Sequence, residues 1–426
     1  SVFQDGLNVG MITSGTMVPY WKFEGEGATM RITDEQERRA LALAYVDAAV
    51  PEEQELEVEV RGRRLNSQLV SWHGRSEAPP FFRAIPIDRK QDSTVTSSDT
   101  LKEKVVLLLK KSLENHEWRQ RSCVNLIPSE MTQSSLVRLL QITDPCGRYA
   151  EHKELLAAFE QEVFYYQGTE FIEWVEERLA EEMRDFLGCP HIESRVISGQ
   201  MANMTVFSAL VDFRNRTERR SEPGRMSLVM NNHIGKGGHL SSQPMGALRD
   251  YVAKDPVTEK YAVLNFPVRK DNPYCIDLDE TAGLLERFDP ELIILGKSMI
   301  LHPEPVAAIR KLLDVKSSRP LLLYDMAHVI GLIGQHFQDP FGEGADIVTG
   351  STHKTLFGSQ RGIIGAAFEE ESPEFELWKV IQRRTFPGAV SNHHLGTLLG
   401  MLMAALEMNE YKNQYQPQVI ANAKAF

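Results

Sequence analysis

The stretches ADIVTGSTHK (residues 345–354) and LLLYDMAH (residues 321–328) are apolar runs of strand length, and each ends in polar residues. The stretches RMSLVMNN (225–232) and ELIILGKS (291–298) have the same form, and helical patterns such as PVAAIRKLLDV (305–315) lie between such runs. Short apolar strands that alternate with helices predict an α/β fold, with a mainly parallel sheet between helices. Because such sheets bind ligands beyond the carboxyl ends of their strands, the polar residues after these runs are the candidate functional residues.

The composition narrows the class of protein. The chain has 426 residues, a net charge of -12 and 25% charged residues, which is an ordinary globular composition. The acidic balance argues against a nucleic-acid partner and against an anionic membrane surface. No run of about 20 apolar residues is present that would span a membrane. The four cysteines form no CxxC pair and no zinc-ligand spacing, so we expect no disulfide framework, no metal site and a reducing, cytoplasmic location.

Three regions follow one another along the chain. Residues 1–85 are β-rich, and ELEVEVRGRRLNSQLVSW (55–72) alternates around an Arg-Gly turn as a hairpin does, which predicts a small β-barrel. The Gly-rich stretch LNVGMITSGTMVP (7–19) predicts turns. Residues 86–100 are polar and rich in Ser and Thr, which is typical of a linker. Residues 101–426 carry the helical and α/β patterns, and neither end shows a terminal signal, so we expect a piece of a longer protein.

Polar residues at three of these positions form a constellation that pyridoxal phosphate (PLP) would use. They are Asp325 and His328 after one apolar run, His353 and Lys354 after another, and Ser198, Gly199 and Gln200 before a helical pattern. A lysine amine forms a Schiff base with PLP, a carboxylate pairs with the pyridinium nitrogen, and N–H groups at a helix start bind phosphate. The GKGGH stretch adds His239, whose ring would stack on the cofactor.

Each of these features alone has a simpler explanation. A lone lysine is a solvated charge, an aspartate after a strand is a helix cap or a core group, and a lone histidine is structural. Ser-Gly-Gln before a helix is an ordinary N-cap, and the G-x-x-x-x-G-K-[ST] phosphate motif does not match at Lys354. The order of all these features on one α/β pattern is what favours a cofactor site.

Several motifs also occur in the order of a known family. They are NLIPSE, RYAE, FYYQGTEFIEWVE, SGQMAN, GGHL, YDMAHVIGL, STHKTLFGSQRG, FPG and QVIANAKA. On these motifs, residues 101–426 resemble serine hydroxymethyltransferase, a fold-type I PLP enzyme. The resemblance implies PLP, a small-molecule amino acid substrate, tetrahydrofolate as co-substrate, and a homodimer or a dimer of dimers. The implied reaction is retro-aldol cleavage of a β-hydroxy amino acid to glycine, with one-carbon transfer to tetrahydrofolate.

The resemblance also implies roles for single residues. The residues that would bind the cofactor are Lys354, Asp325, His328, His239, Ser198, Gly199, Gln200, Ser298, His353 and Gly388. Those that would act in catalysis are Lys354, Glu151, Tyr149 and His239. Those that would contact the amino acid are Ser129, Tyr166 and Arg361. Lys354 would form the Schiff base, Asp325 would pair with the pyridine nitrogen, and Glu151 would move a proton. Tyr149, Tyr166 and Gly388 would reach the site from a partner subunit.

The chain departs from the family pattern in several places. Met131 replaces the last residue of the usual Ser-Glu-Asn, Gln200 stands where a serine is usual, and FPGAVSNHH (386–394) replaces FPGGQGGP. The loop after RYAE is longer than usual, and the small C-terminal domain with its substrate-binding arginine is absent. PLP-dependent threonine transaldolases, which the chain also resembles, use a second aldehyde without folate. A folate-independent threonine aldolase or transaldolase is therefore the alternative function.

The N-terminal region has a resemblance of its own. Residues 5–73 resemble the C-terminal barrel of the glycine-cleavage T-protein, an aminomethyltransferase, which favours a folate-linked function. A docking or structural module is the alternative for this region. The third hypothesis for the whole chain is a non-catalytic scaffold that retains the fold, and the presence of Lys354, Asp325, His239 and Glu151 argues against it.

Overall fold

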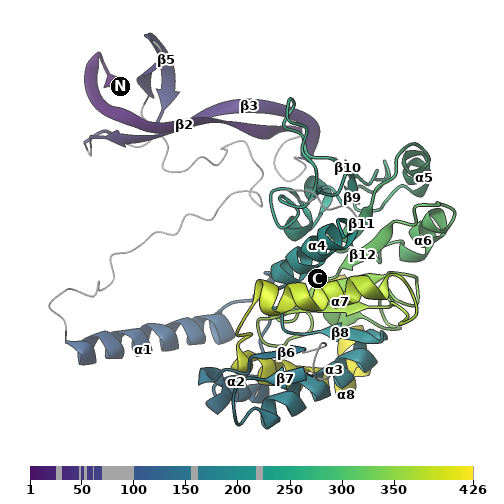
Figure 1. Ribbon diagram of the computed structural model, residues 1–426. Helices are drawn as coiled ribbons and strands as arrows, with labels where there is room; N and C mark the ends of the chain where they lie inside the picture. The colour runs from purple at the N-terminus through teal and green to yellow at the C-terminus, as the bar shows by residue number, and fades with distance from the viewer. Residues whose placement is uncertain are drawn as a thin grey trace. The chain divides into compact units, whose positions relative to one another are not determined.

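The structure, a computed structural model, describes residues 1–24, 31–47, 49–51, 55–60, 62–69, 100–154, 162–216 and 224–425. The chain forms two compact units, Ser1–Glu117 and Trp118–Phe426 (Figure 1). The expected linker, residues 86–100, lies outside the described residues apart from Thr100. The boundary between the units falls after helix α1 (Leu101–Glu117) rather than before it. The helix α1 is described throughout and buries none of its residues.

The first unit contains a five-stranded antiparallel sheet with the strand order β3-β2-β1-β4-β5. Its strands are β1 (Val2–Gln4), β2 (Leu7–Glu24), β3 (Arg31–Val46), β4 (Glu55–Val60) and β5 (Arg63–Gln68). The strands β4 and β5 form the predicted hairpin. Its turn includes Gly62 at φ +77°, a left-handed conformation that glycine adopts without steric strain.

Two features of this sheet differ from the sequence-based predictions. The described strands form an open sheet rather than a closed barrel, because β3 and β5 are its two edges. The Gly-rich residues 7–19 lie inside the long strand β2 rather than in turns. The glycine at position 10 is needed for another reason, since a Cβ on Gly10 would meet the carbonyl oxygen of Tyr45 in the neighbouring strand.

The second unit is built on the predicted mainly parallel sheet. The seven strands have the order β10-β9-β11-β12-β13-β14-β8, and only β14 runs antiparallel to its neighbours. The strands are β8 (His191–Glu193), β9 (Val229–Asn231), β10 (Val263–Asn265), β11 (Leu292–Gly296), β12 (Leu321–Asp325), β13 (Ile347–Ser351) and β14 (Gly362–Ala366). All five residues of β11, β13 and β14 are buried, which is why these strands read as continuous apolar runs.

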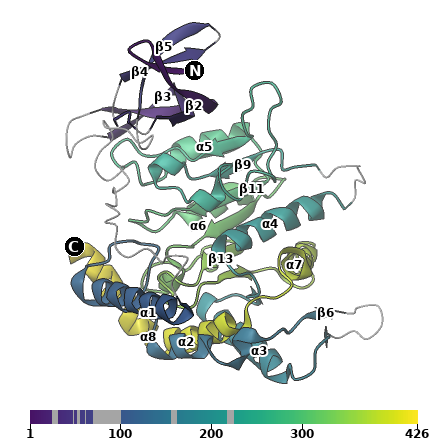
Figure 2. The ribbon, with the colours of Figure 1, turned by 90° about the vertical axis from the view of Figure 1, so that its left-hand side faces the viewer.

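Helices cover both faces of this sheet. They are α2 (Ser135–Gln141), α3 (Glu170–Leu187), α4 (Gly199–Arg214), α5 (Leu278–Arg287), α6 (Val306–Asp314), α7 (Phe375–Arg383) and α8 (Leu395–Ala425). Alternate residues of β11 enter two different cores: Leu292 packs in the core with α4 and α7, and Ile293 packs in the core with α3, α5, α6 and α8. Figure 2 shows α4 and α7 on one side of the sheet and α5 and α6 on the other. None of the described helices is long and apolar enough to cross a membrane.

Candidate active site

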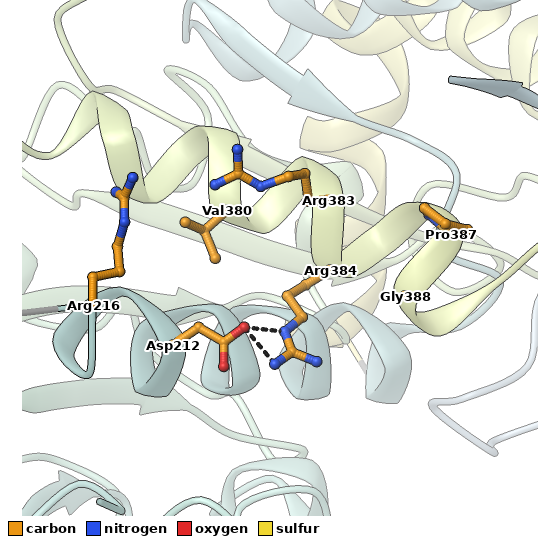
Figure 3. Close-up of a pocket in the computed structure, with 7 residues that line it drawn as sticks. All are labelled: Asp212, Arg216, Val380, Arg383, Arg384, Pro387 and Gly388. Carbon is orange, nitrogen blue, oxygen red and sulfur yellow. Dashed lines mark hydrogen bonds and ion pairs between the residues drawn. The ribbon is translucent and has the colours of Figure 1, made fainter. Parts of the chain in front are cut away.

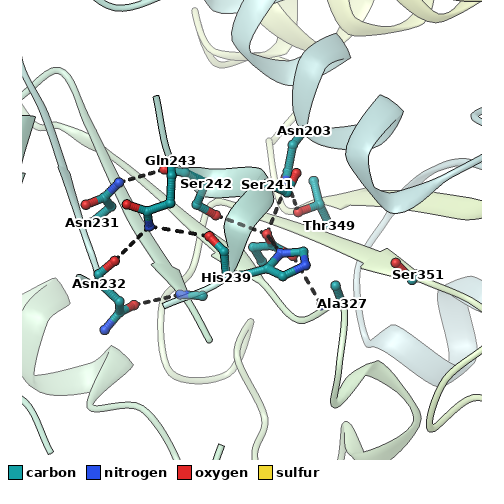
Figure 4. Close-up of polar contacts among 12 residues, drawn as sticks. Asn203, Asn231, Asn232, His239, Ser241, Ser242, Gln243, Ala327, Thr349 and Ser351 are labelled. Atoms are coloured by element: carbon teal, nitrogen blue, oxygen red, sulfur yellow. Dashed lines mark hydrogen bonds and ion pairs between the residues drawn. The ribbon is translucent and has the colours of Figure 1, made fainter. Parts of the chain in front are cut away.

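The carboxyl ends of β12 and β13 meet the N-terminus of α4 (Figure 4). The amide Nδ2 of Asn203, in the second turn of α4, donates to Oδ2 of Asp325 at 2.8 Å, and Thr349 Oγ1 donates to Asn203 Oδ1 at 2.6 Å. The glycine at position 199 allows this close approach, because a Cβ there would meet Oγ of Ser351. The helix start and the two strand ends therefore form one polar site, as the sequence predicts for this edge of the sheet.

Asp325 is a buried carboxylate with many donors around it. It is 1% exposed, and its Oδ2 accepts from Asn203 and from Ser242 Oγ at 3.0 Å, while Nδ1 of His239 lies 2.6 Å away. Burial acts to raise the pKa of Asp325, but His239 and the Asn203 amide outweigh it and hold the pKa below its ordinary value. The carboxylate is therefore ionised at neutral pH, as a partner of a pyridinium nitrogen must be.

Lys354 is a buried amine rather than a surface charge. The side chain is 7% exposed, and its Nζ donates to Ser351 Oγ at 3.0 Å. Burial lowers the pKa of Lys354, and the charge of Asp325 offsets only part of this shift. A lowered pKa increases the share of the neutral amine, which is the form that bonds to carbonyl carbons.

Three histidines lie near the lysine loop and Asp325. The rings of His239 and His328 are 5.3 Å apart and nearly perpendicular. Burial, with the added effect of the Lys354 charge, lowers the pKa of His328 to about 3 and the pKa of His353 to about 4. Among the described residues, the buried Nδ1 atoms of His328 and His353 have no hydrogen-bond partner. Unsatisfied buried nitrogens of this kind fit a site that receives a polar ligand.

The first turn of α4 fits a phosphate group. Oγ of Ser198 accepts from the N–H of Met201, which makes Ser198 the N-cap of the helix. Gly199 is buried and the Gln200 side chain is exposed, so the backbone rather than a side chain faces inward here. The helix start thus offers N–H groups and its positive dipole end to an anion. Ser298 lies near the His239 segment, because its N–H donates to the carbonyl of Gly237 at 2.8 Å.

A second group of predicted residues lies at the surface. Tyr149 and Tyr166 are 51% and 45% exposed, and Ser129 is exposed as well. Tyr166 Oη donates to Oε2 of Glu151 at 3.4 Å, and the charge of Glu151 raises the pKa of Tyr166. The structure brings Tyr149, Glu151 and Tyr166 together, but no contact joins them to Lys354 within the described part of this single chain.

The observed partners of Arg361 are protein groups, whereas the resemblance implies that Arg361 contacts the substrate. Its side chain is fully buried, and its guanidinium donates to the carbonyls of His394 at 3.1 Å and Ser194 at 2.8 Å and to Thr397 Oγ1 at 3.0 Å. Burial lowers the pKa of Arg361 to about 10. Because both of its terminal nitrogens donate to oxygens of the protein, Arg361 holds the chain before α8 in place, while its Nε has no hydrogen-bond partner among the described residues.

Gly388 lines a pocket (Figure 3), and Lys354 is not among the residues that line it. The pocket has a volume of about 450 Å³ and is lined by Asp212, Arg216, Val380, Arg383, Arg384, Pro387 and Gly388. Arg384 is hydrogen-bonded to Asp212, so one arginine charge of the pocket is neutralised from within. The structure therefore does not bring Gly388 to the lysine of the same chain.

Some residues of the site were not predicted from the sequence. Asn203, Ser242, Thr349 and Ser351 all contact Asp325, Asn203 or Lys354. The position of Asn203 could have been predicted from the sequence, because it follows Gly199 by about one helical turn and so lies on the same side of α4. The others lie within apolar runs or loops whose spacing carries no signal for contact.

The sheet order, with its one antiparallel strand, and the buried lysine and aspartate define the α/β fold of fold-type I PLP enzymes. The family model for serine hydroxymethyltransferase matches residues 103–426, and the chain belongs to the serine hydroxymethyltransferase family.

Curated relatives agree with this assignment. The chain is 36% identical over 314 residues to "Serine hydroxymethyltransferase" of Archaeoglobus fulgidus, which covers 74% of this chain and 63% of that protein. It is 34% identical over 314 residues to the protein of the same name from Staphylothermus marinus, with 73% and 63% covered. The chain thus spans less than two thirds of the length of these relatives.

A solved structure shares the fold. L-threonine transaldolase from Pseudomonas fluorescens superposes with a TM-score of 0.61 and 24% identity, over 76% of this chain and 67% of that one. At this level of identity the likeness shows the fold alone.

Proposed function

We propose that the protein is a PLP-dependent serine/glycine hydroxymethyltransferase that transfers a one-carbon unit to tetrahydrofolate. The observation that supports this proposal is the ionised, buried Asp325 at the same end of the sheet as the buried amine of Lys354. When bound, PLP supplies an electron sink that stabilises negative charge at the substrate α-carbon. Membership of the family supports the choice of reaction.

The residues of the chain would divide the remaining tasks. Lys354 would hold PLP covalently, Asp325 would keep the pyridine nitrogen protonated, and His239 would lie against the ring. The N–H groups of Gly199 and Gln200 would hold the phosphate. The neutral imidazoles of His328 and His353 would offer their free Nδ1 atoms to polar groups of the cofactor.

The proposal includes a homodimer, or a dimer of dimers, in a cytoplasmic location. Glu151, Tyr149 and Tyr166 would then act in the site of the partner subunit, with Glu151 moving the proton of the substrate hydroxyl. Large apolar side chains near them support this idea: Leu136, Leu139, Phe171 and Trp174 are between 51% and 55% exposed. Such side chains are typical of a subunit interface. For the N-terminal unit we propose a folate-related, aminomethyltransferase-like module, with a docking module as the alternative.

A folate-independent threonine aldolase or transaldolase is the second candidate function. The observation that favours it is the segment 386–394, which departs from the family pattern on the side expected to face folate. Within it, His393 is only 1% exposed and contacts Glu176 and Arg361, whereas residues 387–389 are exposed.

The test is the visible spectrum of the full-length protein with PLP and glycine, with and without tetrahydrofolate. We expect glycine to change the spectrum of bound PLP strongly only when tetrahydrofolate is present. A change that is independent of folate, together with turnover of threonine and a second aldehyde, would support the second candidate. A protein that binds no PLP would support a non-catalytic scaffold.

A further inference from the structure

A group of three titratable side chains, two buried histidines and the partly buried Glu176, lies outside the candidate site. His152 and His393 are 2% and 1% exposed, and each contacts a different carboxylate oxygen of Glu176. Nε2 of His152 lies 3.1 Å from Oε2, and Nε2 of His393 lies 2.7 Å from Oε1. His152 belongs to the short strand β6 (His152–Glu154), Glu176 to α3, and His393 to the segment before α8. One carboxylate therefore joins three parts of the chain.

The surroundings determine the charge of this group. Burial acts to raise the pKa of Glu176, but His152 and His393 outweigh it and lower the pKa to about 2. Burial lowers the pKa of His393, against the opposing effect of Glu176, and the charges of Arg361 and Arg195 lower it further. At neutral pH Glu176 is therefore a carboxylate anion beside the neutral ring of His393.

Arg361 shows which proton His393 carries. Its Nη2 lies 3.3 Å from Nδ1 of His393, and a guanidinium nitrogen only donates. Nδ1 must therefore accept, which leaves the proton of a neutral ring on Nε2, facing Glu176. A metal ion at Nε2 would move that proton to Nδ1, against the Arg361 donor. We call the contacts of Glu176 with His152 and His393 the clamp; they are close N···O contacts, although Nε2 of His393 and Oε1 of Glu176 have no hydrogen-bond partner among the described residues, and the three residues are all metal-ligand types.

The clamp holds two segments that carry predicted site residues. His152 directly follows Glu151, and its ring stacks on Phe386 with centroids 5.4 Å apart and planes 15° apart. Phe386 lies two residues before Gly388. Through one side chain, α3 therefore fixes both the backbone beside Glu151 and the segment 386–394.

We propose that Glu176 is a positioning residue for Glu151, and that it acts through His152 and His393. This inference rests on the proposed function, in which Glu151 moves a proton. The Glu151 side chain itself has only the long 3.4 Å contact with Tyr166 among the hydrogen bonds of the described residues, so its placement depends on its backbone. A misplacement of about 1 Å in a reacting group lowers a rate by up to about 100-fold.

The variant Glu176→Gln tests the clamp, because it removes the charge and keeps the shape of the side chain. Glu177→Gln is the matched control, since Glu177 is the next residue of α3 and is exposed. Hydrogen–deuterium exchange of residues 148–154 and 386–394 is expected to be faster in Glu176→Gln and unchanged in the control. In the full-length protein we expect kcat per bound PLP to fall about ten-fold, with KM changed by less than about three-fold.

The second variant, His152→Phe, keeps a ring against Phe386 and removes the nitrogen that faces Glu176. It should reproduce the faster exchange and the lower kcat even if Glu176→Gln folds poorly. Unchanged exchange in both variants, or a wild-type kcat, would overturn the positioning role. Zinc bound stoichiometrically by the wild type and lost from Glu176→Gln would also overturn it, because Glu176 would then be a ligand. A wild type that cleaves no β-hydroxy amino acid, with the exchange effect intact, would overturn the proposed function and leave the clamp standing.

Discussion

Asp325 is a buried carboxylate and Glu176 is a partly buried one; both contact histidine, and the surroundings of the two differ. Oδ2 of Asp325 has neutral donors from Asn203 and Ser242 beside the one histidine. Glu176 has a histidine on each oxygen. Among the described residues, Nδ1 of His328 and His353 and, in the other group, Nε2 of His393 and Oε1 of Glu176 have no hydrogen-bond partner. The contacts of Glu176 nevertheless join three segments of the chain, whereas Asp325 lies at the strand ends beside Lys354. The comparison teaches that a carboxylate among histidines can face a ligand site or can join segments of the fold, and that its neighbours along the chain distinguish the two.

The largest expected effect is on the site that contains Asp325 and Lys354. Lys354→Ala should abolish covalent attachment of PLP and all turnover, because it removes the buried amine that would hold the cofactor. Borohydride reduction followed by mass spectrometry measures the attachment. Lys311→Ala, an exposed lysine of α6, is the control and should keep full attachment. PLP attached in Lys354→Ala at the wild-type level would show that the site lies elsewhere.

The next effect distinguishes the chemical roles of the two carboxylates. Asp325→Asn keeps the shape but removes the charge that would hold the pyridine nitrogen protonated, so we expect kcat to fall by about 100-fold or more. Glu176→Gln should lower kcat only about ten-fold. Steady-state kinetics on both variants, with the PLP content measured, gives the comparison. Equal losses in the two variants would contradict the division between chemistry and architecture.

Acid stability should depend on Glu176. Its pKa of about 2 lies below the ordinary value of 4.5, so its ionised form stabilises the fold by about 3 kcal/mol at neutral pH. This contribution is fully present above about pH 4.5 and is lost as the pH falls towards 2. Glu176→Gln should therefore lose about 3 kcal/mol at pH 7, and its difference from the wild type should shrink below pH 4.5. Urea denaturation at several pH values measures this, and a pH-independent difference would count against the clamp.

The smallest expected effect concerns a donor of Asp325. Asn203→Ala removes the amide that joins Asp325 to Thr349, and it leaves both partners buried. We expect a loss of about 2 kcal/mol in the free energy of unfolding, together with weaker PLP binding. Asn422→Ala, at the exposed end of α8, should change neither quantity. Wild-type PLP affinity in Asn203→Ala would show that Ser242 and His239 suffice to hold the carboxylate.

Much of the second unit could be predicted from the sequence. The strands that end at Asp325 and Ser351 are buried on both faces, and such strands have continuous apolar sequences that are easily identified. The start of α4 at Ser198 carries its own cap signal. These features are local, so the sequence contains them almost completely.

Other features depend on contacts that are distant in the chain. The clamp joins residues 152, 176 and 393, and no spacing rule connects positions so far apart. The buried position of Arg361 depends on carbonyls near residues 194 and 394. The open sheet of the first unit was not foreseen, because strand patterns predict pairing but do not say whether the edges close.

The exposed Gln200 beside the buried Gly199 has a consequence for how this site can evolve. If the backbone binds the phosphate, the identity of the side chain at position 200 is free to drift, while a Cβ at position 199 would meet Oγ of Ser351 and would require that side chain to move. Mutational scanning would then find that position 200 tolerates substitution and that the adjacent position 199 tolerates it much less. In that case Gln200, at the position where the family pattern has serine, would leave phosphate binding unchanged.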